Sequence, residues 1–143
     1  MSCSLVLDLI EPKSSISDKY EFLFDSLRKI GGYEFFGFNN SVFLSERSTA
    51  DRNFSMGYFM KEKKCFPEGS DLHETLDLYF QSCSMEVTTE TLSVMGATLA
   101  NGGVCPTTGD KVLACSDVRD VLSLMYSCGM YNYSGEFAFK VGQ

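Results

Sequence analysis

The sequence predicts a mainly α-helical chain with little β-sheet, and three observations support this prediction. Apolar residues recur every three or four positions in most long segments, as they do along one face of an α-helix. Residues that cap helix N-termini precede several of these segments, and glycine or proline follows them. The 143 residues are 44% hydrophobic and 22% charged, which is the size and composition of one globular domain.

Two elements are predicted near the N-terminus. Met1–Ile10 is apolar enough to form a buried helix or a strand. Ser15 or Ser17 then caps a helix that Gly31-Gly32 ends. One apolar stripe runs along this helix and consists of Tyr20, Leu23, Phe24, Leu27 and Ile30.

The next segments carry further capping signals. Asn39-Asn40-Ser41 caps a short segment that runs to Glu46. A longer helix is predicted to begin at Thr49 or Asp51 and to end at Lys64, because Pro67 and Gly69 follow it.

Two helices are predicted after this break. Asp71 with Glu74 three residues later is a capping-box pattern, which opens a helix that runs to about Cys83. Thr88 or Thr89 starts the second helix. Its apolar residues Leu92, Met95 and Leu99 lie on one face.

The last part of the chain is predicted to hold a turn, a helix and a strand. Val104–Leu113 contains proline and glycine and forms a turn or a small hairpin. Ser116 caps a long helix that Gly129 ends. Met130–Gln143 is predicted to form a strand. The apolar positions of that helix are Val118, Val121, Leu122, Leu124 and Met125, and those of the strand are Phe137, Phe139 and Val141.

Charge and composition exclude several classes of function. The net charge of −7 disfavours nucleic acid and anionic membranes as partners, since both bind basic surfaces. A single histidine excludes zinc sites built from histidine pairs. The six cysteines contain no C-x-x-C pair and no signal peptide precedes them, so we expect reduced thiols and an intracellular protein.

Ser26-Leu27-Arg28-Lys29 matches the Ser-x-x-Lys pattern of serine acyl-transfer enzymes. In those enzymes the serine opens a helix and faces a buried lysine. Here it lies in the second half of a predicted surface helix. We therefore interpret this match as a solvated helix face.

The segment from Phe43 to Asn53 is the densest in polar residues. One interpretation is a capped helix start with surface ion pairs. The other is a site for a zwitterionic ligand, in which Glu46 binds an ammonium group and Asn53, near a helix N-terminus, binds a carboxylate. The pattern alone favours the first interpretation.

Three tyrosines raise a similar choice between core packing and a functional phenol. Tyr131 and Tyr133 follow Gly129 in a short loop that could place a phenol in a cleft, and Tyr79 lies in a predicted helix. On pattern alone, ordinary core tyrosines are the better interpretation.

Several ordered motifs resemble the animal, phosphate-activated glutaminases, which belong to the serine β-lactamase-like superfamily. The resemblance covers about residues 20–142. It is carried by Ser45-Glu46-Arg47 through Asp51-Arg52-Asn53-Phe54, Lys61-Glu62-Lys63-Lys64-Cys65-Phe66-Pro67-Glu68-Gly69, Leu76-Asp77-Leu78-Tyr79-Phe80-Gln81, Ala97-Thr98-Leu99-Ala100-Asn101-Gly102-Gly103, Leu122-Ser123-Leu124-Met125 and Ser127-Cys128-Gly129-Met130-Tyr131.

The resemblance implies hydrolysis of L-glutamine to L-glutamate and ammonia through a serine acyl-enzyme. Carried onto matching positions, it implies that Glu46 binds the substrate α-amino group and Asn53 its α-carboxylate. It implies that Tyr79 lines the site near the nucleophile. Tyr131 would be the catalytic phenol beside the scissile amide. It also implies no cofactor and no metal, with inorganic phosphate as activator.

The resemblance also implies that the nucleophile lies elsewhere. In the family the catalytic Ser-x-x-Lys is upstream of the matched segment, and Ser26–Lys29 aligns with a different helix. We therefore expect residues 1–143 to be the helical middle part of a glutaminase-like α/β catalytic domain, with the flanking sheet strands largely missing. Alone, this part is expected to be inactive.

The main alternative is a non-catalytic module that assembles with itself or with a full-length glutaminase through the helix Asp51–Lys64. In the family this helix lies at a subunit interface, where a common tyrosine appears here as Phe59. A likeness to the animal enzymes further implies a mitochondrial location, although the chain carries no targeting peptide of its own.

Overall fold

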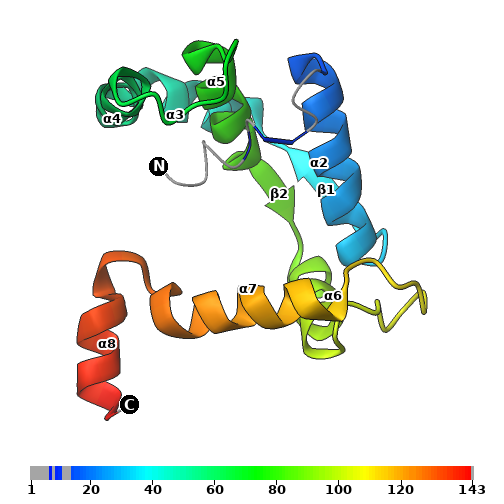
Figure 1. The fold of residues 1–143 in the computed structure, drawn as a ribbon. Helices are drawn as coiled ribbons and strands as arrows, with labels where there is room; N and C mark the ends of the chain where they lie inside the picture. Colours follow the sequence, from blue (N-terminus) through cyan, green and yellow to red (C-terminus); the bar gives the residue numbers. More distant parts are fainter. Residues whose placement is uncertain (1–6, 8, 11–13, 143) are drawn as a thin grey trace. The chain divides into compact units, whose positions relative to one another are not determined.

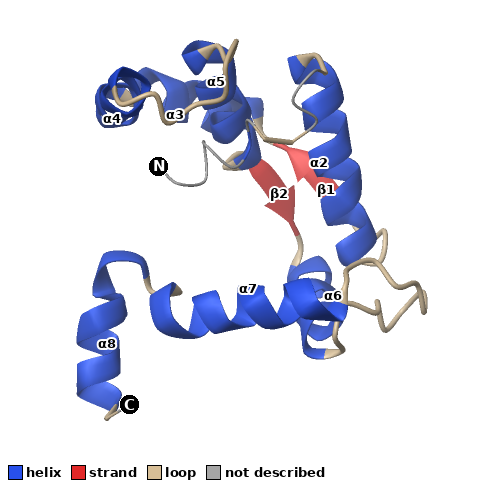
Figure 2. Ribbon diagram, viewed as in Figure 1, coloured by secondary structure: helices blue, strands red, loops and turns tan. Residues whose placement is uncertain are grey.

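A computed structural model describes residues 7, 9, 10 and 14–142 (Figure 1). The predicted element Met1–Ile10 falls almost wholly outside the described residues. The prediction of a mainly α-helical chain is confirmed, since the described residues form helices and the two short strands β1 and β2, which are drawn red in Figure 2. In chain order the elements are α2 (Ile16–Ile30), β1 (Phe36–Phe38), α3 (Asn40–Ser48), α4 (Asp51–Glu62), α5 (Leu72–Ser82), β2 (Met85–Val87), α6 (Thr89–Ala100), α7 (Cys115–Cys128), η1 (Tyr131–Tyr133) and α8 (Ser134–Val141).

The described residues fall into two compact units. Unit 1 comprises the described part of residues 1–27 together with Phe35–Thr88, and unit 2 comprises Arg28–Glu34 together with the described part of residues 89–143. Unit 1 therefore holds most of α2, the two strands and α3 to α5, whereas unit 2 holds α6 to α8.

The core of unit 1 lies between α3, α4 and α5. Ala50 occupies the corner between α3 and α4 and packs with three apolar residues of α5, namely Leu72, Leu76 and Phe80. Around this cluster pack Phe43, Phe54, Phe66 and Tyr79. Gly57 allows α4 to approach α5 closely, because a Cβ atom at this position would lie 2.8 Å from Leu72 Cδ1.

The aromatic residues of α2 pack on β1, which pairs with β2 in an antiparallel two-stranded sheet with Gly37 opposite Glu86. The ring of Phe24 lies 5.4 Å from that of Phe36, and the ring of Tyr20 lies 6.0 Å from that of Phe38, in both cases edge to face. The predicted apolar stripe of α2 is therefore confirmed as its packing face.

Three predicted N-caps of unit 1 are confirmed by their hydrogen bonds. Ser15 Oγ accepts from Asp18 N–H at 3.2 Å, and Asn39 Oδ1 accepts from Val42 N–H at 3.1 Å. Asp71 Oδ1 accepts from Glu74 N–H at 2.9 Å. Each cap satisfies an N–H group that the first helical turn leaves without an acceptor.

In unit 2 the predicted apolar face of α6 is only partly packed, with Met95 and Leu99 half-buried. Leu92 is 61% exposed, whereas Thr91 and Thr98 are completely buried. Thr98 Oγ1 donates to the carbonyl of Ile30 at 2.9 Å, so its hydroxyl satisfies a carbonyl at the C-terminal end of α2. A small side chain with a hydroxyl group suits this close approach to backbone, which a leucine would obstruct.

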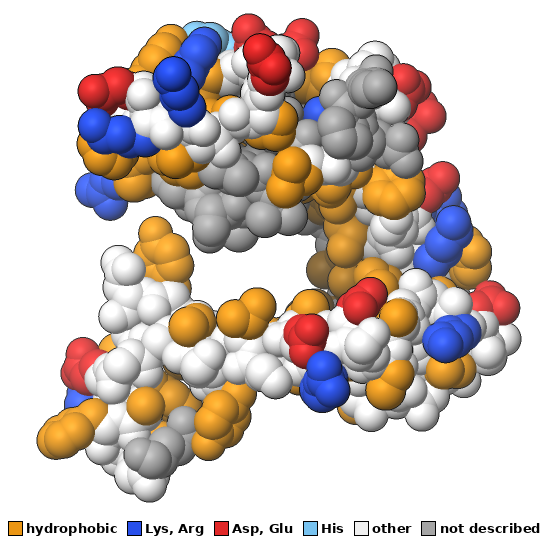
Figure 3. Space-filling view, in the orientation of Figure 1, with side chains coloured by type: hydrophobic (Ala, Val, Ile, Leu, Met, Phe, Trp, Pro, Cys, Tyr) orange, Lys and Arg blue, Asp and Glu red, His pale blue; other side chains and the backbone are white. Residues whose placement is uncertain are grey.

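The rest of unit 2 also differs partly from prediction. The predicted hairpin at Val104–Leu113 is confirmed by an antiparallel bridge between Val104 and Lys111. The N-cap of α7 is Ala114 and not Ser116. Val118 is the buried apolar residue of this helix, and Figure 3 shows hydrophobic side chains at the surface of α7 and α8. Those more than half exposed are Leu124, Met125, Tyr126, Phe139 and Val141.

The predicted C-terminal strand is wrong, because this segment forms η1 and α8. Glu136 and Lys140 form an ion pair of 2.7 Å one helical turn apart. The ring of Phe137 lies 6.2 Å from that of Tyr133 at the same spacing. Gly142, with φ of 72°, ends the helix and donates its N–H to Ala138. These local interactions satisfy backbone hydrogen-bonding groups and pair the two charges within the helix. A β-strand would need a neighbouring strand for its backbone groups.

Candidate functional site

Glu46 lies near the C-terminal end of α3, where its side chain is exposed. Among the described residues its carboxylate has no hydrogen bond and no ion pair. Its neighbour Arg47 instead pairs with Asp77 of α5, with 3.0 Å between Nε and Oδ1. Glu46 therefore presents an uncompensated negative charge that can accept hydrogen bonds from an ammonium group.

Asn53 lies in the first turn of α4, at an N-terminus that no side chain caps. The N-cap is Ala50, and the first intrahelical bond runs from Phe54 N–H to Ala50 O at 3.0 Å. The earlier N–H groups of the turn, including that of Asn53, have no acceptor within the helix. Together with the positive end of the helix dipole and the Asn53 amide, they form a favourable environment for a carboxylate.

Tyr79 lies in α5, in the turn that follows Leu76. Its ring packs against the core cluster of unit 1 and lies 5.8 Å from the ring of Phe80. The side chain is half-buried. This packing fixes the position of the phenol on the same helix that carries Asp77.

Tyr131 lies in unit 2, at the start of η1, with a backbone φ of 52°. This left-handed conformation is uncommon for a residue with a side chain and costs about 1–3 kcal/mol. Ser134 supports the turn, because its Oγ accepts from Met130 N–H at 3.1 Å and donates to Tyr131 O at 2.8 Å. Tyr131 is 87% exposed.

The structure brings three of the four predicted site residues into one unit. Glu46, Asn53 and Tyr79 come from α3, α4 and α5, and both α3 and α4 pack against α5. Tyr131 belongs to unit 2, as does Tyr133. Ser26 lies in the second half of α2 with Lys29 exposed in the last turn, as expected for a solvated helix face.

Sequence reasoning did not single out Cys105, a completely buried residue of unit 2. Desolvation raises the pKa of its thiol, but hydrogen bonds with Thr107 and Thr108 outweigh this effect and lower the pKa to about 6. In the described part of the chain no group of His, Cys, Asp or Glu residues has the arrangement of a metal site. No helix within that part is long and apolar enough to cross a membrane.

Comparison with known proteins yields consistent matches. Residues 3–143 match the family model described as Glutaminase. "Glutaminase liver isoform, mitochondrial" of Rattus norvegicus is 56% identical over 138 residues, which are 96% of this chain and 23% of the rat protein. "Putative glutaminase 2" of Caenorhabditis elegans is also 56% identical, over 139 residues, with the same two coverages. The chain thus spans about a quarter of the length of these curated relatives.

A solved structure shares the same fold. The probable glutaminase from Bacillus subtilis complexed with 6-diazo-5-oxo-L-norleucine superposes with a TM-score of 0.85 at 32% sequence identity. The match covers 95% of this chain and 43% of the Bacillus chain.

Proposed function

The chain belongs to the glutaminase family, and from this premise we propose that it forms the substrate-recognition part of an enzyme that hydrolyses L-glutamine to L-glutamate and ammonia. The observation that carries the proposal is that unit 1 contains both Glu46, near the end of α3, and Asn53, in the first turn of α4. The Glu46 carboxylate, which has no partner among the described residues, and the helix N-terminus at Asn53 are complementary to the two charges of an α-amino acid.

We propose that Glu46 binds the α-ammonium group of L-glutamine and that Asn53 binds its α-carboxylate, together with the free N–H groups of the first turn of α4. Tyr79 would line the same site from α5. The ligand named for the Bacillus relative supports an amino-acid substrate, since 6-diazo-5-oxo-L-norleucine carries the same α-ammonium and α-carboxylate groups as glutamine.

The chemical step of this proposal follows the serine acyl-enzyme route. A serine oxygen attacks the side-chain carboxamide, the C–N bond breaks, and ammonia leaves with a proton that passes through the phenol of Tyr131. Water then cleaves the ester and releases L-glutamate and the serine hydroxyl. The exposure of Tyr131 and the strain of its backbone support a role outside packing.

We assign recognition, and not the nucleophile, to these 143 residues, because Ser26 lies within a helix face and does not open a helix. Calorimetric titration with L-glutamine tests this assignment. Binding to the wild-type chain is expected, with at least a tenfold loss, by order of magnitude, in Glu46→Gln and in Asn53→Ala. Ammonia release by the same samples should be absent. Turnover that Tyr131→Phe abolishes would refute the assignment.

A second proposed function is assembly through α4, with a second copy or with a full-length glutaminase as partner. It is supported by three apolar side chains of this helix that are more than a third exposed, namely Met56, Tyr58 and Phe59. Light scattering on the wild-type chain and on Phe59→Glu tests it. A wild-type assembly that the substitution dissociates is the expected result, and a wild-type monomer at all concentrations would refute self-assembly.

We further propose inorganic phosphate as an activator, no cofactor, and a mitochondrial location. The location is supported by the name of the rat and mouse relatives, which are mitochondrial isoforms. A phosphate titration of glutamine binding tests the first proposal, and imaging of the tagged protein in cells tests the last.

A further inference from the structure

Within the described ranges the Glu46 carboxylate forms no ion pair, although the cationic Arg47 follows it in the chain. Arg47 is long enough to reach it, and Arg47 is 53% exposed, so it can change rotamer. Arg47 nevertheless points to α5, where its Nε lies 3.0 Å from Oδ1 of the half-buried Asp77.

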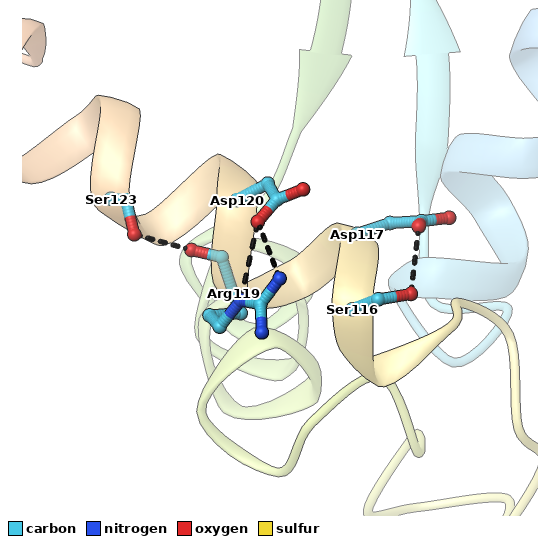
Figure 4. Close-up of polar contacts among 5 residues, drawn as sticks. All are labelled: Ser116, Asp117, Arg119, Asp120 and Ser123. Carbon is cyan, nitrogen blue, oxygen red and sulfur yellow. Dashed lines mark hydrogen bonds and ion pairs between the residues drawn. The ribbon is translucent and has the colours of Figure 1, made fainter.

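Two other places in the same chain show that consecutive residues of opposite charge can pair with each other. Lys63 Nζ lies 3.6 Å from Oε1 of the preceding Glu62. Arg119 folds onto the following Asp120, with its Nη2 3.2 Å and its Nε 3.2 Å from Oδ1 (Figure 4). In these two cases the side chains of consecutive residues reach each other and pair, whereas Asp51 and Arg52 at the start of α4 form no ion pair within the described part of the chain.

We propose that Asp77 is a positioning residue that holds Arg47 away from Glu46 and so keeps the Glu46 carboxylate available for the substrate ammonium group. The proposal rests on the proposed function of Glu46. Without Asp77, Arg47 would compete intramolecularly with the ammonium group for the same carboxylate. The ion pair also joins α3 to α5. Because Arg47 directly follows Glu46, loss of the ion pair would change the surroundings of the Glu46 carboxylate.

The expected size of the effect follows from the strength of an exposed ion pair, which changes an equilibrium constant by a few-fold. Asp77→Asn should therefore weaken L-glutamine binding by about two- to fivefold. Glutaramic acid, which lacks the α-amino group, should bind both proteins equally. The double variant Asp77→Asn/Arg47→Gln should bind L-glutamine as the wild type does, because it contains no competing guanidinium.

Recovery of L-glutamine affinity in the double variant distinguishes competition by Arg47 from a structural role of Asp77. Removal of the Arg47 guanidinium cannot return a displaced α3 to its position. A weakening that also affects glutaramic acid, or that Arg47→Gln fails to restore, would overturn the proposal. Unchanged L-glutamine affinity in Asp77→Asn would overturn it as well.

A second readout does not depend on ligand binding. Solvent exchange of the Arg47 Nε–H, followed by NMR, should be slow in the wild type and should not respond to Glu46→Gln. In the Asp77→Asn background, Glu46→Gln should accelerate it. If L-glutamine binds no variant, the proposed function fails, while this exchange pattern still decides whether Asp77 holds Arg47. Equal sensitivity to Glu46→Gln in both backgrounds would refute the holding role.

Discussion

Replacing Gly57 with alanine tests how closely α4 packs on α5, and with it the position of Asn53. In an open helix position, alanine is more stable than glycine by about 1 kcal/mol. At Gly57 the new Cβ would lie 2.8 Å from Leu72 Cδ1 and 3.4 Å from Cδ2, and Leu72 is only 2% exposed. Overpacking of this kind costs about 1–3 kcal/mol. The steric cost is larger, so we expect a net loss of roughly 1 kcal/mol.

Two further variants make the prediction specific. Gly96 lies in α6, where a new Cβ would meet nothing within 4 Å, so Gly96→Ala should raise stability by about 0.5–1 kcal/mol. Combining Gly57→Ala with Leu72→Val shortens the side chain that the new Cβ would meet. The double variant should therefore be more stable than the sum of the two single changes predicts.

Urea unfolding followed by circular dichroism measures these free energies. The sign of the change caused by Gly57→Ala tests the close packing of α4 on α5. If Gly57→Ala stabilises the protein as much as Gly96→Ala does, α4 does not approach α5 as described. The reasoning on the position of Asn53 would then be wrong.

The remaining predictions concern a cap, a strained residue and a buried thiol. The hydrogen bond from Glu74 N–H is the main cause that lowers the pKa of Asp71 from its usual 3.8. The charged cap therefore stabilises the fold above pH 3.8, and this contribution is lost as the pH falls through the lowered pKa. In urea titrations Asp71→Ala should cost about 1 kcal/mol at pH 7, and the advantage of Asp71 over Asp71→Asn should disappear in acid; a pH-independent difference would contradict this. Tyr131→Gly should raise stability in the same assay by about 1 kcal/mol through relief of the positive φ, and a loss would show that the conformation is not strained. Cys105 should resist alkylation at pH 7 in the native protein despite its lowered pKa of about 6, because the thiol is completely buried; rapid labelling under native conditions, read by mass spectrometry, would refute its burial.

Local chemistry explains which parts of the fold the sequence predicted. The caps at Ser15, Asn39 and Asp71 were predicted correctly because each depends on a side chain and an N–H group within three residues. The complete burial of Thr98 in α6 was not predicted, since its hydroxyl bonds to Ile30, which lies far away in the chain. The alternation of apolar residues near the C-terminus predicted a strand. The segment instead forms a helix, which is stabilised by the Gly142 cap and by side-chain pairs one helical turn apart.

The sequence pattern predicted the candidate site only in part. The carboxylate of Glu46 and the amide of Asn53 fitted a zwitterion site, but pattern alone favoured surface ion pairs. Only the family resemblance reversed that choice. The sequence placed Tyr131 in a short loop after Gly129, the residue type that most readily adopts a positive φ. In the structure Gly129 has a φ of −73° and Tyr131 itself adopts the positive φ. No sequence rule predicts such strain, because it depends on the Ser134 contacts that hold the turn.

The most direct test of the account is a residue-resolved NMR titration of the ¹⁵N-labelled chain with L-glutamine. We expect the largest shifts at the N–H groups of residues 51–53 and at the Asn53 side-chain amide, with smaller ones around Glu46. Glutaramic acid should reproduce the shifts in the first turn of α4 but not those around Glu46, because it retains the carboxylate and lacks the ammonium group. Shifts confined to other parts of the chain, or an identical response to both compounds, would contradict recognition of the substrate by Glu46 and Asn53.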